Sequence, residues 1–307
     1  MKLLLHLYKA FKLKVIYCLI NFFPMKAIIG KYLVFILSFL ALSCKTLNKD
    51  VTYTEMVSKA STQAQRLVNE ADFETCKLGD RKKFGDVWLK NNLWGKSKLK
   101  EGSTPELCSF KKGEYYGWKW QLPNNAGGVI GYPALQIGRN PFENGNEETT
   151  GFPVMVKDIK SLKVSYDVET HVKHKKYNLA FDLWLTDAKD YKLENIQTEI
   201  MIWEDYFDFT SYGKKQETII TPFGTYDVLA GHLENPKFSQ DWQYIAFVRK
   251  TTTQKADIDL AFFLNYLVEN KMIASTHYFT SIEFGNEIGN SSGITMVRKF
   301  DWELKKK

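Results

Sequence analysis

The amino-acid sequence predicts an all-β protein, built as a sandwich of antiparallel sheets with a single helix. Aromatic residues make up 15% of the 307-residue chain, and aromatic side chains favour strands. From Cys76 onward, short runs rich in Val, Ile, Tyr, Phe and Trp alternate with turn-forming clusters. This alternation is typical of an antiparallel sandwich.

Ten of these runs are predicted to be strands, because they combine β-branched and aromatic residues between turn signals. The turn signals include Pro123-Asn124-Asn125, Gly127-Gly128, Asn140-Pro141 and Asn144-Gly145. The predicted strands are 116–121, 129–137, 161–168, 177–185, 196–203, 217–220, 225–230, 242–249, 277–284 and 293–303.

One segment, 256–271, has helical rather than strand periodicity. Asp257 is predicted to cap its start, and Lys271 suits the negative end of the helix dipole. We therefore expect one helix docked on a sheet. Its apolar residues recur at helical spacing: Ile258, Phe262, Phe263, Tyr266 and Leu267.

Residues 1–44 are predicted to be a targeting segment, with Met25 as an alternative start. The segment holds six lysines and no acidic residue, and its apolar stretch leads into Cys44. It resembles a bacterial lipoprotein signal with Cys44 as the lipidated residue. The alternatives are an ordinary cleaved signal and an uncleaved membrane anchor. We expect an exported protein, either a periplasmic or cell-surface lipoprotein or a secreted one.

Charge and composition constrain the partners of the exported portion. Removing the six leader lysines from the net charge of +7 leaves +1, so a nucleic-acid partner is not expected. Residues 45–72 are polar and are predicted to form a tether, followed by one domain over 73–307. We expect a monomer that contacts a membrane only through a lipid anchor.

Two of the four cysteines lie in the leader, which leaves Cys76 and Cys108 as the only exported pair. We predict a disulfide between them, because exported compartments allow disulfides to persist. Neither cysteine has the spacing of a metal site, and the five histidines are scattered. No metal and no cofactor are predicted.

An acidic residue, Glu199, interrupts the apolar strand 196–203. Strand alternation places Glu199, Met201 and Trp203 on one face, and Ile200 and Ile202 on the face toward the core. An ionised carboxylate on a packed strand is costly unless it is paired, exposed to water or used in function.

A second strand, 277–284, leads into another acid, Glu287. Gly285, between this strand and Glu287, allows another backbone segment to approach closely. Two carboxylates on neighbouring strands beside aromatic side chains meet the requirements of glycoside hydrolysis. The charge of the first would raise the pKa of the second. The alternative for each residue is a solvated strand acid.

At these residues the sequence resembles glycoside hydrolase family 12, the endo-β-1,4-glucanases and xyloglucanases. Residues 199–203 look like the family's nucleophile strand, 284–287 like its acid/base segment, and 91–95 like its early substrate strand. The last of these lies between Cys76 and Cys108, as the family's disulfide brackets it. Further segments follow the family's order: 118–120, 131–133, 181–183 and 263–267.

The resemblance implies a β-jelly roll of two antiparallel sheets, with a concave substrate cleft and one helix on the convex side. It also implies a retaining mechanism, with Glu199 as nucleophile and Glu287 as acid/base, their carboxyl groups about 5 to 5.5 Å apart. Asp182 matches the family's third acid and is expected to share a proton with Glu199. Glu283 is expected to bond substrate in the cleft.

Trp94 is the strongest candidate for a sugar-stacking platform, and Asn92 could bond a ring hydroxyl. Met201 is expected to border the reacting sugar. For each aromatic candidate the alternative is core packing, and Trp118 and Trp120 are expected to share one outcome. The weaker platform candidates are Trp118, Trp120, Tyr132 and Trp203.

The chain also departs from the family's pattern. Ile288 and Gly289 follow Glu287 where Pro and an aromatic are common, and segment 208–216 has no match to the family's cleft-crossing loop. Glu204 and Asp205 are expected to be loop acids.

The predicted function is endo-acting hydrolysis of β-1,4-linked glucans, including cellulose-like, mixed-linkage and xyloglucan chains. The alternatives are a noncatalytic glycan-binding jelly roll and a structural envelope lipoprotein.

Overall fold

The computed structural model describes residues 71–99, 101–122, 128–143, 151–173, 176–235 and 240–307. The predicted leader with Met25 and Cys44, and nearly all of the predicted tether, lie outside these described residues. None of the helices within the described ranges has the length and hydropathy needed to cross a membrane.

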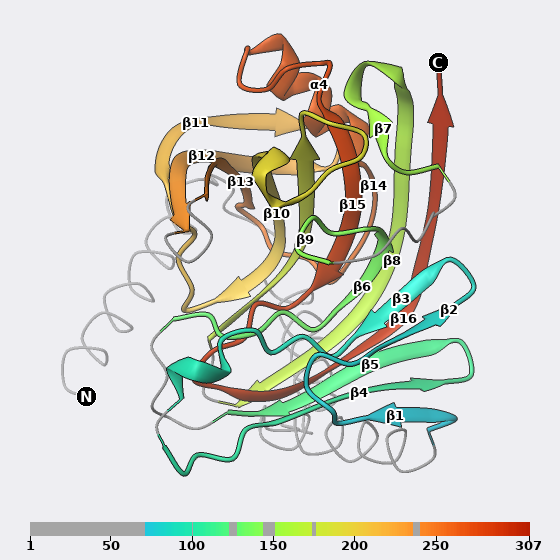
Figure 1. Cartoon of the computed structure of the whole chain (residues 1–307), viewed down its shortest axis with the longest axis vertical. Helices are drawn as coiled ribbons and strands as arrows, with labels where there is room; N and C mark the ends of the chain where they lie inside the picture. The colour runs from blue at the N-terminus through green and yellow to red at the C-terminus, as the bar shows by residue number, and fades with distance from the viewer. Residues whose placement is uncertain (1–70, 100, 123–127, 144–150, 174–175, 236–239) are drawn as a thin grey trace, which may run out of the picture. The chain divides into compact units, whose positions relative to one another are not determined.

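Two β-sheets make up most of the described chain (Figure 1). The smaller sheet has six strands, in the order β1 (Phe73–Thr75), β4 (Glu106–Lys112), β5 (Tyr115–Gln121), β16 (Ser292–Lys306), β8 (Ile159–Lys173) and β14 (Lys255–Asp259). The larger sheet has ten strands. Its order is β11 (Lys214–Thr221), β12 (Gly224–Asn235), β13 (Gln240–Arg249), β10 (Ile196–Phe207), β9 (Tyr177–Thr186), β15 (Tyr278–Gly285), β6 (Ala134–Gly138), β3 (Val87–Lys90) and β2 (Arg81–Phe84), with β7 (Val154–Met155) paired to β15.

Among the described residues, every strand pairing is antiparallel except that of β10 with β13, which is parallel. The exception arises because β11 and β12 form a hairpin that separates β10 from β13 in sequence. The predicted two-sheet sandwich is confirmed, and this parallel pair is its one departure from a purely antiparallel arrangement.

The core between the sheets is apolar and rich in stacked aromatic rings. Phe181 of β9 stacks on Phe284 of β15 with centroids 4.4 Å apart, and Tyr166 of β8 lies 4.8 Å from Phe284. Ile200 and Ile202 are fully buried in this core, as strand alternation predicts. Burial of such side chains stabilises the fold by roughly 1.5 to 3 kcal/mol each.

The single α-helix in the described part of the chain is α4 (Leu260–Glu269), four residues shorter at its start than predicted. The predicted cap at Asp257 is wrong, because 255–259 forms strand β14 against β8. Asp259 is the cap instead, and its carboxylate accepts the backbone N–H of Ala261 at 3.1 Å. Three short 3-10 turns complete the described helical structure: η1 (Lys96–Lys98), η2 (Val156–Asp158) and η3 (Leu193–Asn195).

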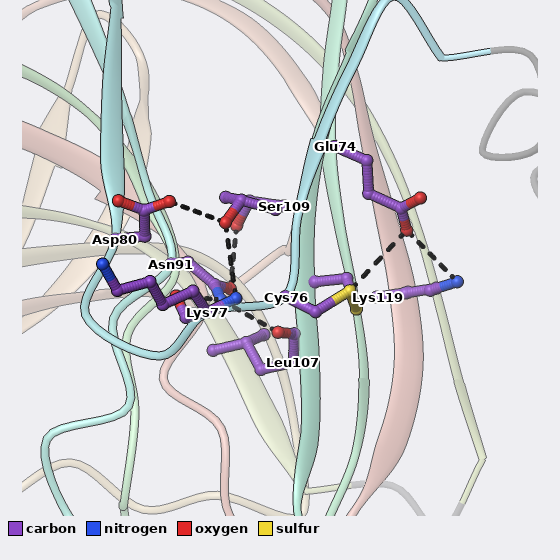
Figure 2. The surroundings of a disulfide bond; sticks show 10 residues. Glu74, Cys76, Lys77, Asp80, Asn91, Leu107, Ser109 and Lys119 are labelled. Atoms are coloured by element: carbon purple, nitrogen blue, oxygen red, sulfur yellow. Dashed lines mark hydrogen bonds and ion pairs between the residues drawn. A yellow bond between two sulfur atoms is a disulfide. The ribbon is translucent and has the colours of Figure 1, made fainter.

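The predicted disulfide between Cys76 and Cys108 is present and ties the segment after β1 to β4 (Figure 2). Closing a loop of 32 residues stabilises the fold by about 3 to 4 kcal/mol in the chain-entropy model. Beside the bond, the buried Asn91 side chain donates to the carbonyls of Lys77 and Leu107 at 3.0 and 2.9 Å. The disulfide therefore fixes the start of the loop that carries Asn92 and Trp94.

Glu204 and Asp205 are not loop acids, which corrects the sequence-based expectation. Both lie within β10, where a bulge between Trp203 and Asp205 breaks the alternation. Glu204 is fully buried and pairs with Arg249 at 3.0 Å. Burial raises the pKa of Glu204, and the Arg249 charge opposes that rise. Glu204 is thus part of a buried ion pair in the core.

Candidate active site

The face of the ten-stranded sheet that points away from the core carries a group of carboxylates, and we call it the site face. Glu199 of β10 lies opposite Trp184 of β9, and the next row on this face pairs Met201 with Asp182 and Asp182 with Glu283 of β15. Glu287 lies two residues beyond the end of β15. Glu199 therefore lies on β10 and Glu287 just beyond β15, and β9 separates these two strands in the sheet.

Close backbone packing positions the segment between Glu283 and Glu287. A Cβ atom on Gly285 would lie 2.1 Å from the carbonyl oxygen of Pro133, so only glycine fits there. Asn286 is buried, and its side chain donates to the carbonyl of Asn178 at 2.7 Å. These contacts hold Glu287 beside the start of β9.

Glu199 is half-buried and accepts a hydrogen bond from Trp242 Nε1 at Oε2, at 2.8 Å. Burial is the main cause that raises the pKa of Glu199 to about 7, while the Trp242 N–H lowers it and the charge of Glu283 raises it. Because the indole N–H favours the charged carboxylate, it supports a nucleophilic form of Glu199.

Glu287 is held by Asn178 through two contacts. The side-chain oxygen of Asn178 accepts the backbone N–H of Glu287 at 2.8 Å, and its amide nitrogen donates to Glu287 Oε2. Burial, followed by the charge of Glu199, raises the pKa of Glu287 to about 8, and the Asn178 bond opposes this rise. Glu287 therefore keeps its proton to higher pH than Glu199.

Asp182 is the most deeply buried of the three acids predicted to be catalytic, at 8% exposure. Burial, and then the charges of Glu199, Glu283 and Glu287, raise its pKa well above the ordinary value. Its Oδ2 accepts Trp184 Nε1 at 3.2 Å, whereas its Oδ1 is buried without a hydrogen-bond partner among the described residues. These surroundings favour a protonated Asp182 beside Glu199.

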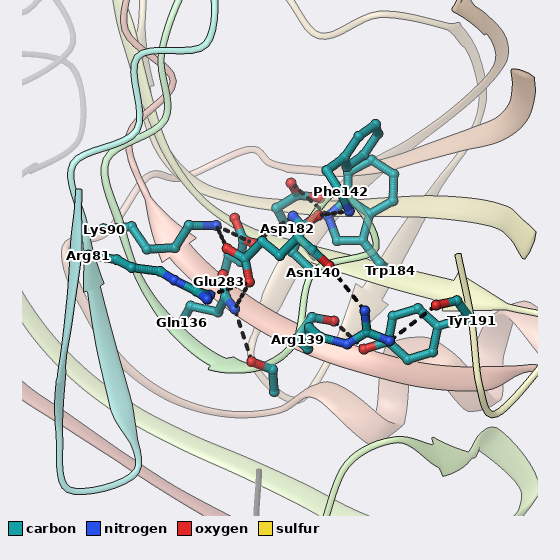
Figure 3. A network of polar contacts seen from close by, with 12 residues as sticks. Arg81, Lys90, Gln136, Arg139, Asn140, Phe142, Asp182, Trp184, Tyr191 and Glu283 are labelled. Atoms are coloured by element: carbon teal, nitrogen blue, oxygen red, sulfur yellow. Dashed lines mark hydrogen bonds and ion pairs between the residues drawn. The ribbon is translucent and has the colours of Figure 1, made fainter. Parts of the chain in front are cut away.

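Glu283 lies in a buried polar network on β3, β6 and β15 (Figure 3). Its Oε1 accepts from Lys90 Nζ at 2.9 Å and from Asn140 Nδ2 at 2.6 Å. Lys90 also pairs with Glu143 at 2.9 Å. Burial opposes the charge of Lys90, but the charges of Glu283 and Glu143 outweigh it and raise the pKa of Lys90. Glu283 is thus an ion-paired residue that helps to shape the site face.

Trp94 lies in the loop after β3 and is 54% exposed, so its ring is accessible. Lys98 Nζ lies 4.7 Å from the centroid of this ring. The neighbouring Asn92 is half-buried, and its carbonyl accepts the backbone N–H of Tyr132 at 2.9 Å. Both residues remain candidates for substrate binding.

Trp118 and Trp120 are wrong as sugar platforms. They lie on β5 of the six-stranded sheet, and they are 0% and 3% exposed within the core. Their indole N–H groups donate to Asn286 at 2.8 Å and to Ser291 at 2.9 Å. They share one outcome, as expected: both brace the segment that carries Glu287.

Tyr132 and Trp203 lie on the site face but are also wrong as stacking platforms, because their rings are covered. They are 5% and 2% exposed, and Trp203 stacks on Phe209 with centroids 5.7 Å apart. Tyr132 donates its hydroxyl to the carbonyl of Ala180 at 2.7 Å. Met201 is likewise nearly buried and packs in the same cluster. These three side chains form the floor beneath the carboxylates.

Several residues on the site face were missed by the sequence analysis. Trp184 and Asp182 lie two residues apart on β9 and therefore share a face of that strand. Strand alternation could have found Trp184 in this way. Trp242 could not be found in this way, because it lies on β13. Only the parallel pairing of β13 with β10 brings it beside Glu199. The exposed ring of Phe142 packs against both indoles.

Tyr212, in the segment without a family match, is a further missed candidate and is 52% exposed. Its hydroxyl donates to the carbonyl of His232 at 2.8 Å, and its ring meets the ring of Tyr244 with centroids 5.7 Å apart. A Cβ on Gly231 would lie 2.6 Å from the Tyr212 ring, so the glycine makes room for it. Tyr212 thus packs on β12, which lies two strands away from the β10 strand of Glu199.

A cavity of about 820 Å³ lies between the start of β10, the β12 and β13 strands and the segment after α4, and Trp242 is among its lining residues. None of Asp182, Glu199, Glu283 or Glu287 lines it. We therefore assign the chemistry to the site face and not to this cavity.

A two-sheet sandwich with a nucleophile-like and an acid-like carboxyl group on one face defines a protein of the β-jelly-roll glycoside hydrolase class. The family model described as glycosyl hydrolase family 12 matches residues 86–305. The chain belongs to glycosyl hydrolase family 12, which makes it an enzyme of the O-glycosyl hydrolase class, and the resemblance noted in the sequence is confirmed.

Proteins named as endoglucanases are similar to this chain over most of its length. Endoglucanase S of Pectobacterium parmentieri is 28% identical over 232 residues, which cover 74% of this chain and 85% of that protein. Xyloglucan-specific endo-beta-1,4-glucanase A of Emericella nidulans is 25% identical over 240 residues, which cover 76% of this chain and 91% of that protein. A solved family 12 xyloglucanase from Bacillus licheniformis superposes with a TM-score of 0.69 at 24% identity, covers 76% of this chain and 100% of that chain, and shows the same fold.

Proposed function

We propose that this protein is a retaining, endo-acting hydrolase of β-1,4-linked glucans. The observation that carries the proposal is the geometry of the pair: Trp242 holds Glu199 on β10 and Asn178 holds Glu287 beyond β15. The higher pKa on Glu287 agrees with this arrangement. Between pH 7 and 8 this order favours an ionised Glu199 together with a protonated Glu287. That combination of a nucleophile and a proton donor is the one that a retaining glycosidase needs.

In the first step, Glu199 attacks the anomeric carbon and the glycosidic C–O bond breaks. Its electron pair stays on the leaving oxygen, which takes the proton of Glu287. In the second step, Glu287 accepts a proton from water as that water attacks the glycosyl ester and frees Glu199. Asp182 holds a proton beside Glu199 and limits the negative charge on the site face.

The substrate chain would cross the strands of the site face. In strand order, Trp94 follows β3 and Tyr212 packs on β12, so the two exposed rings flank the strands that carry the acids. Pyranose rings expose apolar C–H faces that pack on such aromatic rings. We assign Trp94 and Tyr212 as platforms and Asn92 as a hydroxyl contact. Met201 lies in the floor beside the reacting sugar.

The substrate range is proposed to include cellulose-like, mixed-linkage and xyloglucan chains, because the relatives are named as an endoglucanase and a xyloglucan-specific endo-β-1,4-glucanase. The alternative, a noncatalytic glycan-binding jelly roll, does not require Glu199, Glu287 and Asp182 together. We further propose an exported monomer, anchored to a membrane through a lipid on Cys44 if the leader is a lipoprotein signal.

The function is tested by incubating the protein with carboxymethylcellulose, barley β-glucan and xyloglucan. We expect new reducing ends on at least one of them, with an early fall in viscosity because cleavage occurs within chains. Proton NMR of the first product should show the β-anomer, since two inversions retain configuration. Binding without reducing ends on all three polymers would favour the noncatalytic alternative, and an initial α-anomer would exclude retention.

The pH profile provides a separate prediction. Activity requires Glu199 to lose its proton, at a pKa of about 7, and Glu287 to keep its own, up to a pKa of about 8. A plot of kcat/KM against pH should therefore be bell-shaped, with its maximum between these values and apparent pKa values that belong to the coupled pair. A profile without a basic limb up to pH 10 would contradict the role of Glu287 as proton donor.

A further inference from the structure

Three aromatic rings next to the carboxylates form a closed triangle, which we call the aromatic triangle: Phe142, Trp184 and Trp242. Their centroids are 5.1, 5.7 and 5.9 Å apart, and all three pairs meet edge to face. Figure 3 shows the Phe142 ring against the Trp184 ring above Asp182. Edge-to-face contacts of this kind restrict the orientation of each ring.

Each indole of the aromatic triangle donates its N–H to a different carboxyl group. Trp242 Nε1 reaches Glu199 Oε2 at 2.8 Å, and Trp184 Nε1 reaches Asp182 Oδ2 at 3.2 Å. An indole N–H can only donate, so each of these two oxygens must act as an acceptor. Asp182 Oδ1 is then the oxygen left to carry the proton of that residue.

The environment of Glu199 contains several other titratable groups. These are Asp182 on β9, Glu283 on β15, Glu287 beyond β15 and Tyr244 on β13. The charge of Lys90 on β3 lowers the pKa of Asp182, and Lys90 also pairs with Glu283. Among the contacts described for Glu199, the Trp242 N–H is the one that favours its charged form.

We propose that Trp242, held by the aromatic triangle, is a positioning residue for the nucleophile Glu199. This inference rests on the proposed function. The N–H holds Oε2 in a fixed direction and leaves Oε1 to attack the anomeric carbon. As the bond from Oε1 forms and the glycosidic C–O bond breaks, Oε2 becomes the carbonyl oxygen of the ester and still accepts the N–H. In the second step, the ester C–O bond breaks and its electron pair returns to the same hydrogen-bonded carboxylate.

Shape alone does not account for an indole at this position. Trp242 is 8% exposed and Trp184 is 5% exposed, and the indole N–H of each donates to a carboxyl group. A phenyl ring would supply similar apolar packing without a donor. The N–H group is therefore the feature that distinguishes Trp242 from a packing residue.

The test compares Trp242→Phe with the wild type and with Trp302→Phe, which removes an indole from β16 of the other sheet. We expect Trp242→Phe to lower kcat by about 10- to 100-fold, the effect of losing a hydrogen bond to a charged group, with little change in KM. The acidic limb of its pH profile should move to higher pH, because the pKa of Glu199 rises without the donor. Trp302→Phe should leave both unchanged.

Carbon-13 NMR titration of the glutamate carboxyls gives a second readout that does not need turnover. In Trp242→Phe the Glu199 resonance should titrate at higher pH than in the wild type. An unmoved Glu199 titration and an unmoved acidic limb would overturn the inference, even if activity fell through loss of packing. Absence of hydrolysis by the wild type would instead count against the proposed function, and the NMR titration would still decide the role of Trp242.

Discussion

Glu199→Ala is expected to abolish hydrolysis of β-glucans while sugar binding survives. The substitution removes the atom that forms the glycosyl ester, and loss of a covalent nucleophile leaves no equivalent route. Removing a half-buried carboxylate also lowers the negative charge near Asp182 and Glu287, so the fold should tolerate it. Reducing-end assays measure the activity, and isothermal titration calorimetry with a cello-oligosaccharide measures the binding.

The matched control for this experiment is Glu303→Gln, which changes an exposed acid on β16 of the other sheet. It should keep wild-type activity. Normal turnover by Glu199→Ala would refute the assignment of the nucleophile. The inactive variant also permits a binding test of the platforms, since Trp94→Ala and Tyr212→Ala in that background should each weaken the affinity for the oligosaccharide.

Glu287→Ala is expected to lower activity on polysaccharides by about 10²- to 10⁴-fold, the usual range for loss of a general acid/base group. A dinitrophenyl glycoside should be much less affected in the first step, because its leaving group needs no proton. The second step lacks its base, so added azide should restore turnover by attacking the glycosyl ester without help. Steady-state rates on both substrates, with and without azide, measure these effects.

The basic limb of the pH profile should also disappear in Glu287→Ala, because the group whose deprotonation ends activity is gone. Glu303→Gln again serves as the control and should keep that limb. Equal loss on the polysaccharide and on the dinitrophenyl glycoside, with the basic limb retained, would contradict the assignment of Glu287 as acid/base.

Local sequence was sufficient to predict the direction of side chains along the strong strands. In β10, the two-residue period places Ile200 in the core and Glu199 on the opposite face, and both positions are observed. The same period correctly groups Trp118 with Trp120. Alternation predicts which residues share a face, but it does not say whether that face meets solvent or another sheet. Both tryptophans were therefore assigned to the wrong environment.

Short strands and charged strands were among the elements that the sequence analysis missed. β2 (Arg81–Phe84) carries three basic residues in four, and β4 (Glu106–Lys112) begins and ends with charge. Such segments become strands because neighbouring strands supply hydrogen-bond partners, not because of their own propensity. β14 was read as the first turn of the helix, since its apolar residues fit both periods.

The sequence by itself determined the family, the alternating strands and the two carboxylates that we assign to catalysis, because these depend on residues close together in the chain. Only the tertiary structure decided what surrounds those carboxylates. Trp242 is 43 residues from Glu199 and reaches it through a parallel strand pair. Trp118 of the six-stranded sheet meets Asn286, which follows β15 of the ten-stranded sheet. The pKa of a buried acid depends on its neighbours in space, and no local sequence pattern contains that information.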